Sequence, residues 1–237
     1  MPDFLLWAHR GASIDAPENT LAAFELAERQ GADGIELDVQ LSRDGVPLIL
    51  HDETLERTSN GRGRVDQADW SELQQLDAGR WFAAGYAGER LPSLAEVLDW
   101  AGDRLPLNLE VKDSAAAGAL LTTLQQFPRA RVLVSSFDHR LLNSLRGFDP
   151  DLPLGFLNDS RFWRHALHRA IRDRAASLHP RAERLSRLLM AACRQAGLAV
   201  YPWTVDAAAD ARRLRELGAA GIFTNRPGAL RRELRLD

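Results

Sequence analysis

The sequence predicts a (β/α)8 TIM barrel with one small insertion after the second strand. Apolar runs of strand length alternate with segments of helical apolar spacing along almost all of the 237 residues. This alternation indicates a parallel sheet covered by helices. About eight strand–helix units follow one another, as a single barrel of roughly this length requires. A doubly wound open sheet is the alternative fold with the same alternation.

Each unit consists of an apolar run and an amphipathic segment. We predict strands at residues 4–8, 34–39, 107–111, 132–136, 153–157, 175–178, 199–204 and 221–224. From apolar residues spaced by three and four, we predict helices near residues 19–30, 93–103, 115–126, 139–146, 161–173, 183–196, 207–217 and 228–234.

Two segments interrupt this alternation. Residues 42–45, Ser-Arg-Asp-Gly, form a turn signal, and residues 47–50 follow as another strand. This order predicts a hairpin that folds back on the second strand. Residues 53–92 are polar and irregular, and they are too long for an ordinary loop of a barrel. We therefore expect one domain over residues 1–237, with the insertion 53–92 over the barrel mouth.

The composition excludes several classes of protein. Hydrophobic residues make up 45% and charged residues 27%, as in an ordinary globular protein. The net charge of −3 is too near neutral for a general nucleic-acid binder. The chain has no long apolar run and no signal-peptide pattern, so we expect no stable membrane insertion. Cys193 is the only cysteine, which fits a cytoplasmic protein. The sequence leaves open whether the protein is a monomer or a homodimer.

Acidic residues occupy the predicted inward faces of two strands. Glu36 and Asp38 alternate with apolar residues in strand 34–39, and Glu110 does so in strand 107–111. Buried carboxylates need a cation nearby, and barrel enzymes place their chemistry at the C-terminal ends of strands. Three converging carboxylates form an all-oxygen site of the kind that Mg²⁺ or Ca²⁺ prefers. The alternative is a structural network of ion pairs with arginines.

Histidines end two of the predicted strands. His9 ends the first strand, and His51 ends the returning arm of the hairpin, where antiparallel register brings it near the acidic residues of strand 34–39. An imidazole with an unperturbed pKa of about 6.5 transfers protons in both directions near neutral pH. We therefore predict that this pair performs acid–base catalysis. His179, at the end of the sixth strand, is a candidate for the lining of the mouth.

Two basic residues accompany the carboxylates. Arg10 follows His9 directly, and Lys112 lies two residues beyond Glu110 on the same strand face. Lys112 is also the only lysine among 30 basic residues. Guanidinium and ammonium groups beside a metal form a receptor for phosphate. An ion pair of Lys112 with Glu110 or Asp38 is the structural alternative, and both can hold in different states.

The chain resembles the glycerophosphodiester phosphodiesterases, specifically the short cytoplasmic bacterial type. The matching motifs run in family order over nearly the whole chain, and residues 158–176 are the least diagnostic. They are His9-Arg10-Gly11, Pro17-Glu18-Asn19-Thr20, Glu36-Leu37-Asp38-Val39, Asp44-Gly45, His51-Asp52, Leu55-Glu56-Arg57-Thr58, Leu109-Glu110-Val111-Lys112, Ser135 with Phe137, Trp203-Thr204-Val205 and Thr224-Asn225-Arg226-Pro227.

The resemblance implies metal-dependent hydrolysis of glycerophosphodiesters to glycerol 3-phosphate and an alcohol. In the family, the residues matching His9 and His51 are the general acid and base. Those matching Glu36, Asp38 and Glu110 bind the divalent cation, Mg²⁺ or Ca²⁺, and those matching Arg10 and Lys112 contact the phosphate. By analogy, Phe137 and Trp203 form walls of the pocket. The sequence leaves open which histidine is the acid, and whether water or the substrate's 2-hydroxyl is the nucleophile.

Two other functions remain compatible with the sequence. A lysophospholipase D would keep the barrel and the metal but would need an apolar channel in the insertion, where Trp70, Trp81, Phe82 and Tyr86 lie. A barrel that binds a phosphate ligand without turnover is the second alternative. The presence of both His9 and His51 argues against it.

Overall fold

The chain folds into a barrel of parallel strands, which confirms the predicted fold class. The computed structural model describes residues 4–236, and among them eight parallel strands follow the order β8-β7-β6-β5-β4-β2-β1-β9. The ring closes between β8 and β9, where the Ala220 N–H donates to the Val200 carbonyl at 3.0 Å. These strands are β1 (Leu5–His9), β2 (Gly34–Leu41), β4 (Leu107–Val111), β5 (Val132–Ser136), β6 (Leu154–Asn158), β7 (Ser177–Pro180), β8 (Ala199–Val200) and β9 (Gly221–Thr224).

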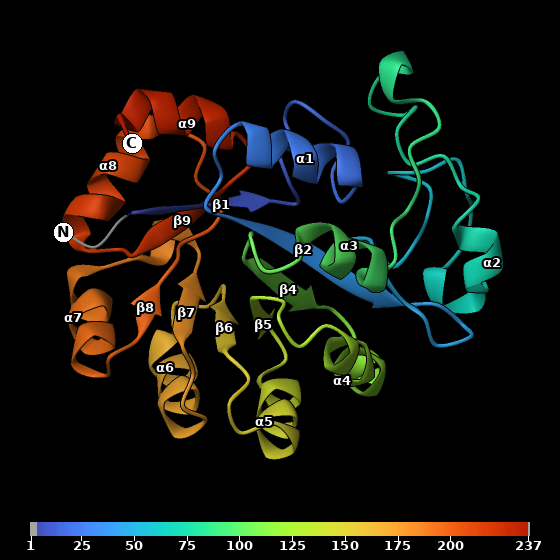
Figure 1. Cartoon of the computed structure of the whole chain (residues 1–237). Helices are drawn as coiled ribbons and strands as arrows, with labels where there is room; N and C mark the ends of the chain where they lie inside the picture. Colours follow the sequence, from blue (N-terminus) through green and yellow to red (C-terminus); the bar gives the residue numbers. More distant parts are fainter. Residues whose placement is uncertain (1–3, 237) are drawn as a thin grey trace.

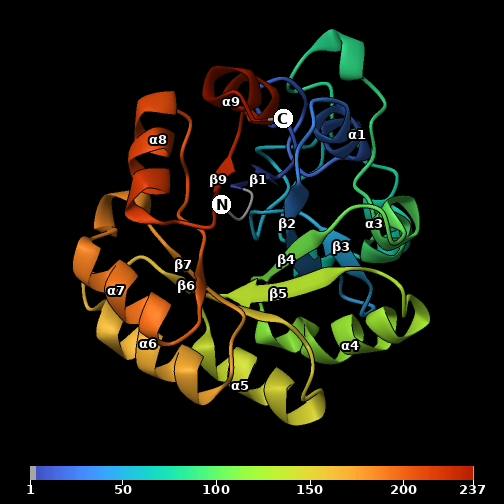
Figure 2. The ribbon, with the colours of Figure 1, turned by 60° about the vertical axis from the view of Figure 1, so that its left-hand side comes forward.

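Helices cover the outside of the barrel, as Figures 1 and 2 show from two directions. They pack their apolar faces on the strands and form the main core there. These helices are α1 (Leu21–Arg29), α3 (Leu94–Ala101), α4 (Ala117–Gln126), α5 (His139–Phe148), α6 (Trp163–Arg172), α7 (Arg187–Gln195), α8 (Ala208–Leu217) and α9 (Pro227–Leu234).

Element ends differ from the sequence prediction by a few residues. The helix expected from residue 19 begins at Leu21, because the Thr20 side chain accepts a hydrogen bond from the Ala23 N–H and caps it. The strand expected over 199–204 is shorter, Ala199–Val200, although the Tyr201 and Trp203 N–H groups still donate to the carbonyls of Leu178 and Pro180; Pro202 between them has no N–H to donate.

The predicted hairpin is present. Strand β3 (Pro47–Ile49) pairs antiparallel with β2, with Val39 opposite Ile49. The long segment that follows carries one short α-helix, α2 (Trp70–Leu73), and lies beside α1 and α3 (Figure 1). It shares a small second core with the returning arm of the hairpin, formed by Leu48, Leu50, Leu55, Val65, Leu73, Ala78 and Leu91. This core gives the insertion a defined structure, so its side chains can be held against the barrel.

The two faces of each strand differ in chemistry. Leu37 and Leu109 point toward the helices and belong to the main core. Glu36, Asp38 and Glu110, on the opposite parity, are also buried, but inside the barrel. Charged groups therefore collect at the barrel axis while the helices pack on the apolar face. This division positions the site.

Candidate active site

Three acidic side chains meet inside the barrel near the C-terminal ends of β2 and β4. In the register of these strands, Asp38 lies opposite Glu110, and Glu36 lies two residues before Asp38, opposite Asn108. The exposed fractions of Glu36, Asp38 and Glu110 are 2%, 1% and 7%. One oxygen of each carboxylate lies within 4.8 Å of the others. The structure thus brings together the carboxylates that strand parity assigned to one face.

Two cations partly neutralise this cluster. The Lys112 Nζ lies 2.9 Å from Asp38 Oδ1 and also contacts Glu110, and the Arg10 Nε lies 3.3 Å from Asp38 Oδ2. Burial opposes the charged form of Asp38, but Lys112 and Arg10 overcome it and lower the pKa of this carboxyl. Burial, together with the Asp38 and Glu110 charges, raises the pKa of Glu36. The ion pairs named as the structural alternative for Lys112 are therefore present, with both Asp38 and Glu110.

The two cations do not fully compensate the negative charge of the three carboxylates. The Glu36 Oε1 atom is buried and has no hydrogen-bond partner among residues 4–236. Burial and the Asp38 charge also raise the pKa of Glu110. Carboxylate oxygens are the ligands that hard divalent cations prefer. Glu36, Asp38 and Glu110 can therefore hold such an ion.

His9 lies beside the carboxylates, at the end of β1. Its Nδ1 is 2.7 Å from the Asn225 Oδ1, and its Nε2 is 3.9 Å from the Glu36 Oε2. The Asn225 amide donates to Asp206 at 2.7 Å, which fixes its oxygen as the acceptor toward His9. Burial and the Arg10 charge lower the pKa of His9 to about 4. The ring is therefore neutral at pH 7, with the hydrogen on Nδ1.

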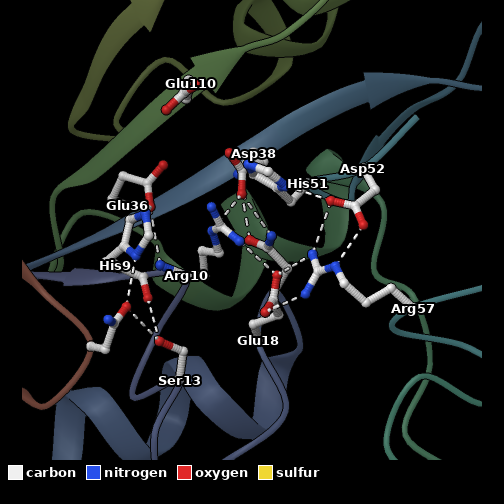
Figure 3. A network of polar contacts seen from close by, with 12 residues as sticks. His9, Arg10, Ser13, Glu18, Glu36, Asp38, His51, Asp52, Arg57 and Glu110 are labelled. Atoms are coloured by element: carbon white, nitrogen blue, oxygen red, sulfur yellow. Dashed lines mark hydrogen bonds and ion pairs between the residues drawn. The ribbon is translucent and has the colours of Figure 1, made fainter. Parts of the chain in front are cut away.

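His51 reaches the site from the insertion side and has a different partner. Its Nδ1–H donates to the Asp52 carboxylate at 2.6 Å. Asp52 accepts further hydrogen bonds from Arg57, which also contacts Glu18. Glu18 in turn accepts from the Arg10 guanidinium at 2.9 Å. Figure 3 shows this continuous network, with His9 on one side of Arg10 and His51 on the other.

Several residues of this network received no role from the sequence. Glu18, Asp52, Arg57 and Asn225 lie inside motifs that mark the family, but the motifs do not specify what each side chain contacts. Asn19, in one of these motifs, has φ +59° and donates from its amide to Asp38 at 2.8 Å.

A pocket of about 140 Å³ opens above the carboxylates. Residues from the predicted site line it, among them His9, Arg10, Glu36, His51, Glu110, Lys112, Phe137 and Trp203. The Phe137 and Trp203 rings meet edge to face at 5.6 Å. Of three larger hollows, those between α4 and α5 and between α7 and α8 contain none of these groups, and the third contains only Lys112, so the chemistry of the lining identifies the site.

His179 does not share this lining. It is fully buried in the barrel, where its Nε2 bonds the Ser177 hydroxyl at 2.8 Å and its carbonyl accepts from the Trp203 indole. Burial lowers the pKa of His179 to about 3. It therefore supports the pocket wall from behind instead of forming it.

The aromatic residues of the insertion lie apart from the pocket. The Trp81 and Tyr86 rings both meet Phe82 edge to face, and the Tyr86 hydroxyl donates to the Asp15 carbonyl. None of these three, nor Trp70, is among the described residues that line the pocket. The apolar channel that a lysophospholipase D would need is not formed by these side chains.

Comparison with known proteins agrees with this geometry. Residues 9–229 match the model of the glycerophosphoryl diester phosphodiesterase family. The chain is 39% identical over 236 residues to a glycerophosphodiester phosphodiesterase of Caldanaerobacter subterraneus subsp. tengcongensis, covering 95% of this chain and 96% of the relative.

Solved structures of phosphodiesterases have the same fold as this chain. A phosphodiesterase of Oleispira antarctica in complex with its product sn-glycerol-3-phosphate superposes with a TM-score of 0.90 at 32% identity, covering 98% and 96% of the two chains. A glycerophosphodiester phosphodiesterase of Thermotoga maritima has a TM-score of 0.82 at 28% identity, with 97% of each chain covered. The chain therefore belongs to the glycerophosphoryl diester phosphodiesterase family and is a phosphoric diester hydrolase.

Proposed function

We propose that this enzyme hydrolyses glycerophosphodiesters to glycerol 3-phosphate and an alcohol with a divalent cation, Mg²⁺ or Ca²⁺, and two histidines. The observation that carries the proposal is the different hydrogen bonding of the two imidazoles around one carboxylate cluster. The product complex of the Oleispira antarctica relative supports glycerol 3-phosphate as the product.

Glu36, Asp38 and Glu110 would hold the cation. When bound, the ion polarises the phosphoryl oxygens and stabilises the charge that develops on them. A divalent cation among three carboxylates, Arg10 and Lys112 changes the formal charge of the cluster from −1 to +1. The loaded site then attracts an anionic diester.

Arg10 and Lys112 bind the non-bridging phosphate oxygens. Both line the pocket, with 18% and 22% of their side chains exposed, so each has donors that face the substrate. Arg10 has φ +59° and precedes Gly11, and this backbone turn directs its side chain back toward the carboxylates. Phe137 and Trp203 form the wall against which the glycerol carbons rest.

His9 acts as the general base. It is neutral at pH 7, and its Nδ1–H is held by Asn225, so the lone pair of Nε2 is available on the pocket side. This lone pair takes the proton from the attacking oxygen, whether that oxygen belongs to water or to the substrate's own 2-hydroxyl.

His51 acts as the general acid. The Asp52 carboxylate accepts the hydrogen bond from its Nδ1–H and orients the ring, so that Nε2 faces the pocket. The Nε2–H then protonates the alkoxide that leaves phosphorus, which is a poor leaving group without a proton. When water attacks, turnover ends with the proton gained by His9 returning to solvent and His51 taking up another. When the 2-hydroxyl attacks, the alcohol leaves a cyclic phosphate, which a water molecule then opens to glycerol 3-phosphate: His51 takes the proton of that water, and His9 returns its proton to the departing 2-oxygen.

Leaving-group chemistry tests this assignment. Alanine variants at His9 and His51 are assayed with glycerophosphoethanolamine and with bis(4-nitrophenyl) phosphate, whose nitrophenolate leaves without a proton. We expect His51→Ala to lose at least about 100-fold on the first substrate but far less on the second. His9→Ala should lose similarly on both. The reverse pattern would exchange the two roles, and full activity of either variant would remove that residue from the mechanism.

A parallel assay separates the other candidate functions. Wild-type enzyme is incubated with glycerophosphocholine and with lysophosphatidylcholine, with Mg²⁺ or Ca²⁺, and the release of glycerol 3-phosphate, choline and lysophosphatidic acid is measured. We expect glycerol 3-phosphate from the first substrate and little choline from the second. Preferred release of lysophosphatidic acid would indicate a lysophospholipase D.

A further inference from the structure

A single arginine of the insertion connects the two halves of the active site. Arg57 comes from the insertion after β3, outside the barrel strands. Its Nε and Nη2 donate to the two oxygens of Asp52 at 2.5 and 3.0 Å. Its Nη1 and Nη2 donate to the two oxygens of Glu18, both at 2.9 Å. One guanidinium thus holds two carboxylates at once, as Figure 3 shows.

Each of these carboxylates orients a residue of the active site. Asp52 accepts the Nδ1–H of His51, and Glu18 accepts from the guanidinium of Arg10. Arg10 has a second anchor, because its Nε also lies 3.3 Å from Asp38. For the His51 ring, Asp52 is the sole hydrogen-bond partner among the residues that the structure describes. The position of His51 therefore depends on Asp52 and, through it, on Arg57.

The electrostatics of the network give Arg57 more weight than an ordinary surface ion pair. Its partners Glu18 and Asp52 are only 15% and 27% exposed, so solvent screens these contacts weakly. Hydrogen bonds from Arg57 are the main reason why the pKa of Asp52 is lowered to about 2. Without the Arg57 guanidinium, the Asp52 and Glu18 carboxylates would lose their shared hydrogen-bond donor and the positive charge between them.

Arg64, in the same insertion, provides the contrast. Its exposure of 44% matches the 43% of Arg57, and it also contacts two carboxylates, Glu53 and Asp66. Those carboxylates are 71% and 45% exposed, and neither contacts a catalytic histidine or Arg10 in the described chain. Position in the network, not the number of contacts, distinguishes Arg57.

We propose that Arg57 is a positioning residue of the hydrolytic reaction, and that through it the insertion holds the general acid His51 in its working orientation. The planar guanidinium fork is required, because an ammonium group cannot bind both carboxylates in two-point contacts. The inference rests on the acid role proposed for His51. It gives the insertion a role in catalysis, which is to hold His51 in place, in addition to the roles of the barrel residues and the metal site.

Steady-state kinetics of Arg57→Gln and Arg64→Gln, with glycerophosphoethanolamine and excess Mg²⁺, test the inference. A misplaced catalytic group costs up to about 100-fold in rate, so we expect Arg57→Gln to lower kcat by about 10- to 100-fold. Because Arg10 keeps its contact with Asp38, KM should stay within about threefold of wild type. Arg64→Gln should match wild type, and both variants should unfold at similar temperatures.

Two further measurements separate positioning from a general loss of structure. Millimolar guanidinium should restore activity to Arg57→Ala but leave Arg64→Ala unchanged. The double variant Arg57→Gln/Asp52→Asn should be no slower than the poorer single variant, because both act through the same ring.

Each possible failure has a distinct meaning. If His51→Ala is inactive in the same assay while Arg57→Gln has wild-type kcat, the inference about Arg57 is wrong and the proposed mechanism stands. If Arg57→Gln is slow but guanidinium does not rescue the alanine variant and the double variant is additive, Arg57 is only structural. If His51→Ala keeps full activity, the acid role of His51 fails, and this inference fails with it.

Discussion

Replacing Glu36 by glutamine should stabilise the protein without metal and destabilise it, relative to wild type, with metal. Glu36, Asp38 and Glu110 carry three negative charges against the two positive charges of Arg10 and Lys112, which leaves a net charge of −1 in a buried site. Glutamine keeps the shape and an acceptor for the Arg10 backbone N–H, which now bonds Glu36 at 3.0 Å. It removes the uncompensated charge.

The expected size of the effect follows from Coulomb's law. At 4.8 Å and an effective dielectric constant of about 20, each pair of carboxylates repels by about 3 kcal/mol. Attraction of Glu36 to the two cations offsets much of its repulsion from two carboxylates. We expect a net gain of about 2 kcal/mol for Glu36→Gln, which raises the unfolding temperature of a chain of this size by about 4–8 °C.

Metal reverses the order of stability. A cation at 100 times its dissociation constant stabilises the wild type by about 2.7 kcal/mol. Glu36→Gln loses a ligand and most of this gain. The assay is thermal unfolding of both proteins in EDTA and in excess Mg²⁺ or Ca²⁺, with Asp38→Asn as the matched control. Asp38 pairs with both cations, so Asp38→Asn should lower the unfolding temperature in EDTA, opposite in sign to Glu36→Gln.

Two results would refute this reasoning. If Glu36→Gln unfolds at a lower temperature than wild type in EDTA, the cluster is not short of positive charge. If Mg²⁺ and Ca²⁺ raise the unfolding temperature of the variant as much as that of the wild type, Glu36 is not a ligand. Wild-type turnover in excess EDTA would argue separately against a labile metal.

Lys112→Arg keeps the charge but replaces a compact ammonium by a broad planar group, so we expect kcat/KM to fall by at least about tenfold; wild-type kinetics would show that a lysine is not needed there. Asn225→Leu removes the acceptor of the His9 Nδ1–H, and kcat should fall by about 10- to 100-fold on both diester substrates; a loss confined to glycerophosphoethanolamine would contradict this. In the folded protein His179 stays neutral down to its pKa of about 3, whereas in the unfolded chain it takes up a proton near pH 6.5. The contribution of neutral His179 to the free energy of unfolding is therefore fully present above pH 6.5 and is lost as the pH falls below it. Urea titrations should show that His179→Leu flattens this decline by up to about 1.4 kcal/mol per pH unit, and an unchanged slope would show that another group is responsible.

The sequence predicted the barrel because the fold depends on repeated local patterns. Apolar periodicity identifies the strands and helices, and side chains alternate across each strand, so Glu36, Asp38 and Glu110 could be assigned to one face. The hairpin was equally accessible, since Asp44-Gly45 is a local turn signal. Element ends were less certain, because a cap such as Thr20 or an interruption such as Pro202 acts on a single residue.

Within the site, the sequence predicted which residues lie together but not how they are connected. Strand ends and residue types predicted one site for the two histidines, the three carboxylates, Arg10 and Lys112, and the structure brings these side chains together, while the roles given to them stay predictions. His179, which was predicted to line the pocket, shows the limit of this reasoning. Its place at a strand end suggested the pocket lining, but packing against Phe223 and Tyr201 holds it inside the barrel.

By itself, then, the sequence determined the fold class and which polar side chains share one face of the barrel strands, because both depend on spacing along one strand or helix. The tertiary structure alone decided the partners of those groups. His9 meets Asn225, 216 positions away, and Arg57 meets Glu18, 39 positions away. These contacts depend on where loops from different strands and the insertion come together at the barrel mouth. They distinguish the two histidines, because an amide oxygen holds one ring and a carboxylate holds the other.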